Sequence, residues 1–258
     1  MGPTPTFPPQ AVPAFYQLLD GFRELPGAQR EAEAVAKLLR TLALTGVAAK
    51  EEVLWGRLAP WVLHLATHGI FLSNLEEWQL PGTRAALLEL PPFHPRPEPS
   101  AFPLLWMPGE FGPMNRSALL LSGVRQGANV EDKSRDGLLT AEEARSLNLD
   151  GTQLVVLSAC DTGRGEAIAG QGIYGLRRAF LIAGAETVIT SLWRVQDEAT
   201  GELMMLYYQK LLDPKRPRDR LDAMIESMKE LRARPERSHP YYWASFLSTG
   251  ADGPLRRR

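Results

Sequence analysis

Two side chains in this sequence have the types and the placement needed for nucleophilic chemistry. Cys160, the only cysteine, follows the apolar run 154–157 and two small residues. His68 stands in the same way after the run 61–67 and directly before Gly69. Both runs are typical of buried strands, so we expect each side chain just past the carboxyl end of its strand. A thiol beside an imidazole is a minimal nucleophile and base, because the imidazole takes the proton of a thiol that is mostly protonated at neutral pH.

The glycine after the histidine suits the same chemistry. Without a side chain, Gly69 leaves room for a carbonyl oxygen to approach its backbone N–H. Together with the N–H of Cys160 it is predicted to form an oxyanion hole, in which each donor contributes about 2.7–4 kcal/mol. The alternative is an inert buried cysteine with a satisfied core histidine. The matching placement of the two residues after separate strands favours the chemical interpretation.

The elements that must position these residues follow from hydrophobic periodicity and turn signals. Helices are predicted over 27–45, 49–58, 140–147, 171–183, 197–212 and 218–232, and strands over 61–67, 117–123, 154–157, 186–192 and 243–247. The helix at 140 begins with a capping box, Thr140-Ala141-Glu142-Glu143. Strands that alternate with helices predict an α/β fold with a mainly parallel sheet covered on both faces.

Proline and charge mark the boundaries of the predicted domain. Residues 1–24 begin with five prolines in thirteen positions and are expected to be an extended lead-in to a domain over 25–250. Residues 72–116 contain nine of the 21 prolines and are expected to be an irregular insertion, partly polyproline II. Residues 251–258 end in three arginines and are expected to be a solvated basic tail.

Composition excludes several classes of partner. The chain has 258 residues and a net charge of −1, so no electrostatic argument favours a nucleic acid or a membrane surface. No apolar run of 18 residues predicts a membrane span. One cysteine excludes an internal disulfide framework and fits a reducing compartment, so a cytoplasmic location is expected.

Six blocks of sequence, in order, carry a resemblance to a known family. The two signature blocks are Leu63-His64-Leu65-Ala66-Thr67-His68-Gly69 and Leu157-Ser158-Ala159-Cys160-Asp161-Thr162-Gly163. The others are Leu25-Pro26-Gly27 with Glu31-Ala32, Gly170-Gln171-Gly172, Ser191-Leu192-Trp193 with Val195, Asp197 and Thr200, and His239–Phe246. Each block is modest evidence by itself, whereas six in the right order are specific. Together they resemble the CHAT family of caspase-like peptidase domains, which are related to separases.

The resemblance implies a caspase-like three-layer sandwich that hydrolyses peptide bonds in a protein or peptide substrate. It implies His68 as general base and acid, Cys160 as nucleophile and Gly69 as oxyanion donor, with neither cofactor nor metal. It also suggests a regulatory protein partner or an upstream repeat domain. Such domains open with one or two strands before the Leu-Pro-Gly block, so the short lead-in predicts that N-terminal strands are missing here or are supplied by another chain or an upstream segment.

Substrate recognition has weaker signals. Asp161 and Asp197 are expected near the carboxyl edge of the sheet, where an acidic group favours a basic residue before the scissile bond, as in related separases. Turn formation equally explains Asp161, and helix N-capping explains Asp197. In caspase-like enzymes the strand over Ser191, Leu192 and Trp193 pairs with the substrate backbone, although Trp193 also suits a core position.

Three other functions fit parts of this sequence: a metal site, a dinucleotide site and a scaffold. His64 and His68 have the spacing of a metal pair on a helix, but on a strand about 13 Å separates them, so His64 is predicted to be a core residue or a residue that supports the site. Gly170, Gly172 and Gly175 fit a dinucleotide fingerprint, but they stand too far beyond the strand. The third is a catalytically silent, truncated interaction or scaffold module, which a sheet without its edge strand would favour.

Overall fold

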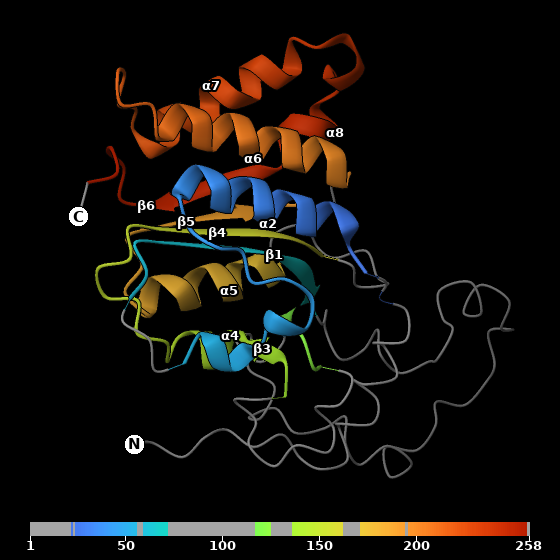
Figure 1. The fold of residues 1–258 in the computed structure, drawn as a ribbon, viewed down its shortest axis with the longest axis vertical. Coiled ribbons are helices and arrows are strands. Elements are labelled where there is room, and N and C mark those ends of the chain that lie inside the picture. The colour runs from blue at the N-terminus through green and yellow to red at the C-terminus, as the bar shows by residue number, and fades with distance from the viewer. Residues whose placement is uncertain are drawn as a thin grey trace, which may run out of the picture.

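One six-stranded mixed sheet is the centre of the molecule (Figure 1). The computed structural model describes residues 22, 24–55, 59–71, 117–124, 136–161, 171–193 and 196–256. Within them the strand order is β3-β2-β1-β4-β5-β6. The strands are β1 (Val62–Phe71), β2 (Ser117–Leu120), β3 (Leu138–Thr140), β4 (Leu154–Asp161), β5 (Thr187–Ser191) and β6 (Phe246–Gly250).

The direction in which successive strands are added to the sheet reverses between β1 and β4. The central strands β1, β4 and β5 are parallel, whereas β2, β3 and β6 pair antiparallel at the two edges. From β1 the chain continues outward to β2 and β3, and from β4 it continues the opposite way to β5 and β6. The predicted parallel arrangement therefore holds for the three central strands. The carboxyl ends of β1 and β4 form the switch point at which α/β proteins bind ligands.

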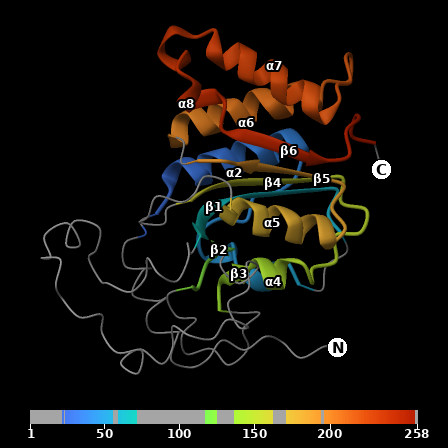
Figure 2. The same cartoon turned by 180° about the vertical axis from the view of Figure 1, so that it is seen from behind.

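Helices cover both faces, which completes the predicted α/β sandwich (Figures 1 and 2). One face carries α2 (Pro26–Leu39) and α6 (Asp197–Leu211), with α7 (Arg220–Arg232) outside α6. The other carries α4 (Ala141–Ala144) and α5 (Gln171–Ile182). The short helix α8 (Pro240–Trp243) leads into β6.

The alternation of β4 between two cores shows why its sequence is continuously apolar. Val155 and Leu157 pack into the cluster that contains Phe180 of α5. Leu154 and Val156 pack into the cluster that contains Leu203 of α6. A strand covered on both sides has no solvated face, so it shows no polar alternation.

Several local predictions differ from the structure. The first helix ends at Arg40, which adopts the left-handed conformation with φ 56°, and Leu42 beyond it is 89% exposed. In its described part, through residue 55, the helix predicted over 49–58 is replaced by the 3-10 turns Gly46–Ala48 and Glu51–Val53. The capping box at Thr140 is confirmed, with both of its hydrogen bonds formed. Strand β3, directly before it, was not predicted, because three residues are too short to show a period.

The C-terminal residues pack against the body of the domain as far as they are described. The backbone N–H of Arg256 donates to Gln153 Oε1 at 2.7 Å, and its carbonyl accepts from the Trp61 indole at 3.0 Å. Its guanidinium, 65% exposed, pairs with Glu186. The backbone hydrogen bonds of Arg256 therefore hold this segment against the domain, whereas its charges predicted a solvated tail.

Some expectations concern residues that the structure does not describe. The insertion over 72–116 lies outside the described residues, as does the lead-in over 1–24 except for Phe22 and Glu24. The expectation about missing N-terminal strands falls there as well. None of the described helices has the length and apolarity that a membrane crossing requires.

Candidate active site

The register of the two central strands brings the predicted nucleophile and base together. β1 and β4 pair in parallel so that His68 stands opposite Cys160 and Gly69 opposite Asp161. Neighbouring strands lie about 4.8 Å apart, and residues in register lie on the same face of a sheet. Two residues that are 92 positions apart in the sequence therefore share one face at the switch point.

Both residues lie inside their strands, whereas we predicted them just past the strand ends. β1 continues through Phe71 because β2 pairs with its far half, from His68 opposite Leu120 to Phe71 opposite Ser117. β4 continues to Asp161. Gly69 is consequently a strand residue between Leu119 and Asp161, not the start of a turn. Its role as an oxyanion donor stays a prediction.

Helix N-termini gather at the edge of the sheet where the two residues lie. α5 and α6 follow β4 and β5 and return along the sheet, so each begins at the carboxyl edge. α2 begins beside α6: a Cβ added to Gly27 would lie only 2.4 Å from the Asp197 Cβ. The N-terminus of a helix carries a partial positive charge, so this edge favours a thiolate or an oxyanion.

The imidazole of His68 has an aromatic neighbour. The ring centroid of Phe22 lies 4.9 Å from that of His68, and the planes meet edge to face at 66°. Phe22 also packs against a buried apolar cluster that lies on β1, β2 and β3 and contains Ile70 and Ala118. The segment before α2 thus reaches the site directly, a contact that no sequence pattern indicated.

The residues proposed for substrate recognition occupy different environments. Ser191 is 2% exposed, and its hydroxyl donates to the Trp193 carbonyl at 2.7 Å. The N–H of Leu192 donates to the Ser245 carbonyl at 2.6 Å, continuing the pairing of β5 with β6. The Trp193 indole donates to the Tyr241 carbonyl at 3.2 Å. The β5 edge over Ser191 and Leu192 is therefore already paired.

The two acidic candidates are also placed by the backbone. Asp161 ends β4 beside Gly69. Asp197 is exposed and is the first residue of α6, whereas the N-cap position belongs to Gln196 and has no side-chain capping bond. The N-capping explanation of Asp197 is therefore wrong, and its position beside Gly27 places it at the carboxyl edge.

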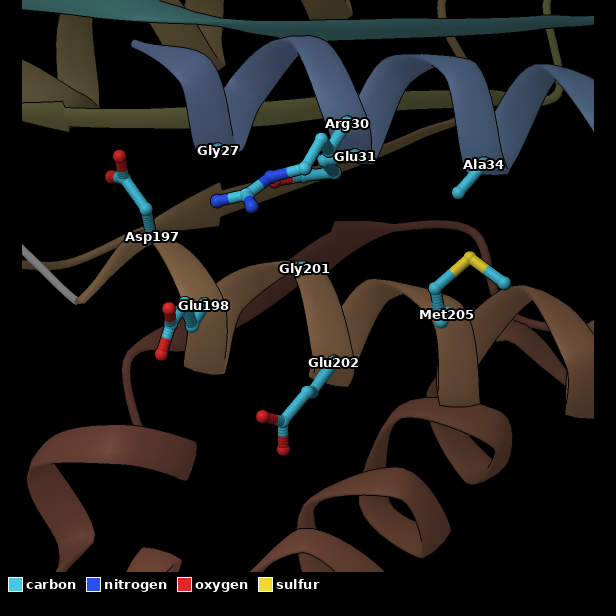
Figure 3. Close-up of a pocket in the computed structure, with 9 residues that line it drawn as sticks. All are labelled: Gly27, Arg30, Glu31, Ala34, Asp197, Glu198, Gly201, Glu202 and Met205. Atoms are coloured by element: carbon cyan, nitrogen blue, oxygen red, sulfur yellow. The ribbon is translucent and has the colours of Figure 1, made fainter.

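A groove of about 300 Å³ runs between α2 and α6 (Figure 3). Both helices run in the same direction, with Gly27 and Asp197 at one end of the groove and Ala34 and Met205 at the other. Gly201 widens it, since nothing lies within 4 Å of the position of its missing Cβ. The full lining is Gly27, Arg30, Glu31, Ala34, Asp197, Glu198, Gly201, Glu202 and Met205.

Charged side chains tie the outer wall of this groove to the C-terminal part of the domain. Glu202 pairs with Arg234 and Arg237, each at 2.8 Å. The hydrogen bond from Arg237 lowers the pKa of Glu202. Arg237 also lies over the Tyr242 ring, 5.4 Å from its centroid. The start of α6 is thereby held from the side opposite to α2.

Beneath the groove, His64 connects three elements. Its Nε2 lies 3.0 Å from Glu31 Oε1 on α2, and its Nδ1 lies 3.1 Å from the Tyr208 hydroxyl on α6. A neutral ring satisfies both contacts, with Nε2–H donating to the carboxylate and the tyrosine hydroxyl donating to Nδ1. The His64 side chain is 6% exposed, which agrees with a core or supporting position. Among the described residues, no cluster of histidine, cysteine and carboxylate side chains has the geometry to hold a metal ion.

The charged residue Glu31 lies on the buried face of α2. Glu31 is 4% exposed. It stands four residues before Val35 and seven before Leu38, which is the spacing of the apolar face, so its burial had a signal in the sequence. Of the fingerprint glycines, Gly172 and Gly175 lie within α5 and not in a loop that follows the strand, which removes the dinucleotide interpretation.

Comparison with known proteins agrees with this geometry. The CHAT domain family matches residues 9–251. Tetratricopeptide repeat protein 28 of Homo sapiens is 30% identical over 237 residues, and the protein of the same name from Mus musculus is 31% identical over 237 residues. Each match covers 90% of this chain but 9% of the relative, so the chain spans about a tenth of those proteins. With its signature blocks on neighbouring parallel strands and this match over most of its length, the chain belongs to the CHAT domain family.

Proposed function

We propose that this domain is a cysteine-type endopeptidase in which Cys160 and His68 form the catalytic dyad. The observation that carries the proposal is the register of β1 and β4, which sets these two residues opposite each other at the switch point of the sheet. The family membership supports the same chemistry, because CHAT domains resemble caspase-like peptidases. The helix N-termini at this edge add an electrostatic environment that favours negative charge.

The reaction uses the two side chains in sequence. His68 takes the proton of the Cys160 thiol, and the thiolate attacks the carbonyl carbon of the scissile bond. The backbone N–H groups of Gly69 and Cys160 stabilise the oxyanion that develops. The imidazolium then protonates the leaving amine, which departs and leaves an acyl-enzyme. His68 next deprotonates a water molecule that hydrolyses the thioester, and the thiol is regenerated.

Substrate recognition in this proposal begins beyond the paired part of β5. Because the Leu192 N–H already donates to the Ser245 carbonyl, strand addition by a peptide starts at Trp193. The Ser191 hydroxyl supports Trp193 by donating to its carbonyl. Asp161 and Asp197, both at the carboxyl edge, favour a basic residue before the cut. The matched relatives are named for tetratricopeptide repeats, so we propose that an upstream repeat domain or a regulatory partner acts on this domain in the cytoplasm.

The test is covalent labelling and peptide cleavage by the full chain and its variants. A peptidyl acyloxymethyl ketone with arginine at the reactive end is expected to label the wild type once, and a peptide library is expected to be cut after basic residues. Cys160→Ala and His68→Ala are each expected to abolish cleavage while circular dichroism and urea unfolding stay unchanged. Cleavage that persists in Cys160→Ala refutes the proposal.

A second function has one observation in its favour, which is that the matched relatives are named for tetratricopeptide repeats and not for a peptidase activity. A scaffold module would bind a partner without turnover. If Cys160 in the folded wild type reacts with iodoacetamide no faster than free cysteine, and no peptide is cut, the scaffold function replaces the peptidase.

A further inference from the structure

We propose that Phe22 is a positioning residue for the imidazole of His68, so that the segment before α2 controls the reactivity of Cys160. The inference rests on the proposed function, since it concerns the same dyad. The observation is the edge-to-face contact between the two rings, with centroids 4.9 Å apart and planes at 66°. Residue 22 lies outside every regular element and four positions before α2.

The strand register fixes the backbone of His68, so the orientation of its ring depends on its side-chain torsions and on the contacts of the ring. The strand register holds His68 opposite Leu120 on one side and Cys160 on the other. Rotation about the two side-chain torsions decides whether the imidazole meets the thiol. A neighbouring ring restricts that rotation, because edge-to-face aromatic pairs prefer a narrow range of mutual orientations.

Phe22 is itself anchored, which a positioning role requires. It packs against the buried apolar cluster of Ile70, Ala118, Leu120 and Leu138, which are 4–6% exposed. Val124 packs against the same cluster. The cluster therefore supplies a fixed base for Phe22 and a matched control residue, since Val124 shares the packing but has no ring to place against the imidazole.

The ring is also suited to the charged state of the dyad. Proton transfer from Cys160 makes His68 an imidazolium, and a cation over the face of an aromatic ring within about 6 Å is attracted to that ring. The preference of aromatic pairs for one arrangement corresponds to a factor of about 2 to 13 in population. Removal of the ring is therefore expected to lower the rate constant for Cys160 alkylation by two- to tenfold.

The experiment is a double-mutant cycle on the full chain, with iodoacetamide as the probe at neutral pH. Because the chain has one cysteine, the alkylation rate reports Cys160 alone. Phe22→Ala and Phe22→Leu are expected to lower the rate by two- to tenfold, Phe22→Trp to keep most of it, and Val124→Ala to stay within twofold of wild type. In a His68→Ala background, Phe22→Ala is expected to have no further effect. With a peptide substrate, Phe22→Ala lowers kcat and leaves KM unchanged.

The outcomes separate this inference from the proposed function. If His68→Ala leaves the alkylation rate unchanged, the dyad itself is refuted. If His68→Ala lowers the rate but Phe22→Ala does not, only the positioning role is refuted. An equal loss in Phe22→Ala and Val124→Ala, or full activity in Phe22→Leu, assigns Phe22 to packing and overturns the inference.

Discussion

Replacing His64 with leucine is expected to destabilise the domain strongly, because the substitution leaves a buried charge without its partner. The side chains of His64 and Glu31 are only 6% and 3% exposed, so solvent screens their contact little. Removal of the hydrogen-bond donor from a buried charged acceptor costs about 3 kcal/mol or more, because the carboxylate keeps its desolvation penalty without the bond that offset it. The Tyr208 hydroxyl, on a fully buried residue, loses its hydrogen-bond partner at the same time.

Smaller changes to the same network separate its parts. Tyr208→Phe removes one hydrogen bond and keeps the ring, so a loss of about 1 kcal/mol is expected. His64→Leu combined with Glu31→Leu removes both polar partners and is expected to recover most of the loss of the single variant, because a buried pair replaced by apolar groups is often neutral. His239→Leu is the control: His239 is exposed and only caps α8 by accepting from the Tyr241 N–H, so about 1 kcal/mol is expected.

The measurement is urea unfolding followed by circular dichroism, with linear extrapolation to water. His64→Leu is expected to lower the midpoint while the slope stays that of the wild type, which shows that the same surface is exposed. A cost below about 1 kcal/mol, or a double variant less stable than His64→Leu, would refute the reasoning that Glu31 is a charge held by His64.

Three further predictions concern stability. Gly27→Ala places a Cβ against Asp197 and is expected to lower the free energy of unfolding in urea by about 1–3 kcal/mol. Gly201→Ala, on the open groove, is the control and is expected to be neutral or stabilising. Equal effects of the two substitutions would contradict the close approach of Gly27 to Asp197. Burial and the nearby acidic groups Glu143 and Asp136 raise the pKa of Glu51 to about 8, so its contribution to stability is greatest below pH 4.5 and is lost as the pH rises to 8. Glu51→Gln is expected to flatten that decline, and an unchanged difference between unfolding at pH 5 and pH 9 would contradict the assignment. Thr140→Ala removes the capping box and is expected to cost about 1 kcal/mol, a loss that Thr140→Ser should largely restore; identical midpoints for Thr140→Ala and wild type would show that the cap adds nothing.

Local patterns in the sequence determined the elements that carry the site. The apolar runs before His68 and Cys160 predicted two buried strands, and the capping box at Thr140 predicted the start of a helix. These predictions hold because propensity, periodicity and caps depend on residues within a few positions of one another. The ordered signature blocks identified the family for the same reason, since each is a short contiguous run.

Contacts between distant segments were decided only by the tertiary structure. β1 extends past His68 because β2 supplies hydrogen-bonding partners to the far half of β1. No residue near His68 in the sequence predicts this pairing. Glu31 is buried because His64, 33 positions away, donates a hydrogen bond to its carboxylate. The Phe22 ring contacts the His68 ring across 46 positions of sequence, and no hydrophobic periodicity predicts this contact. Strand register, buried polar pairs and ring contacts depend on which surfaces meet after folding, so a pattern confined to neighbouring residues does not contain them.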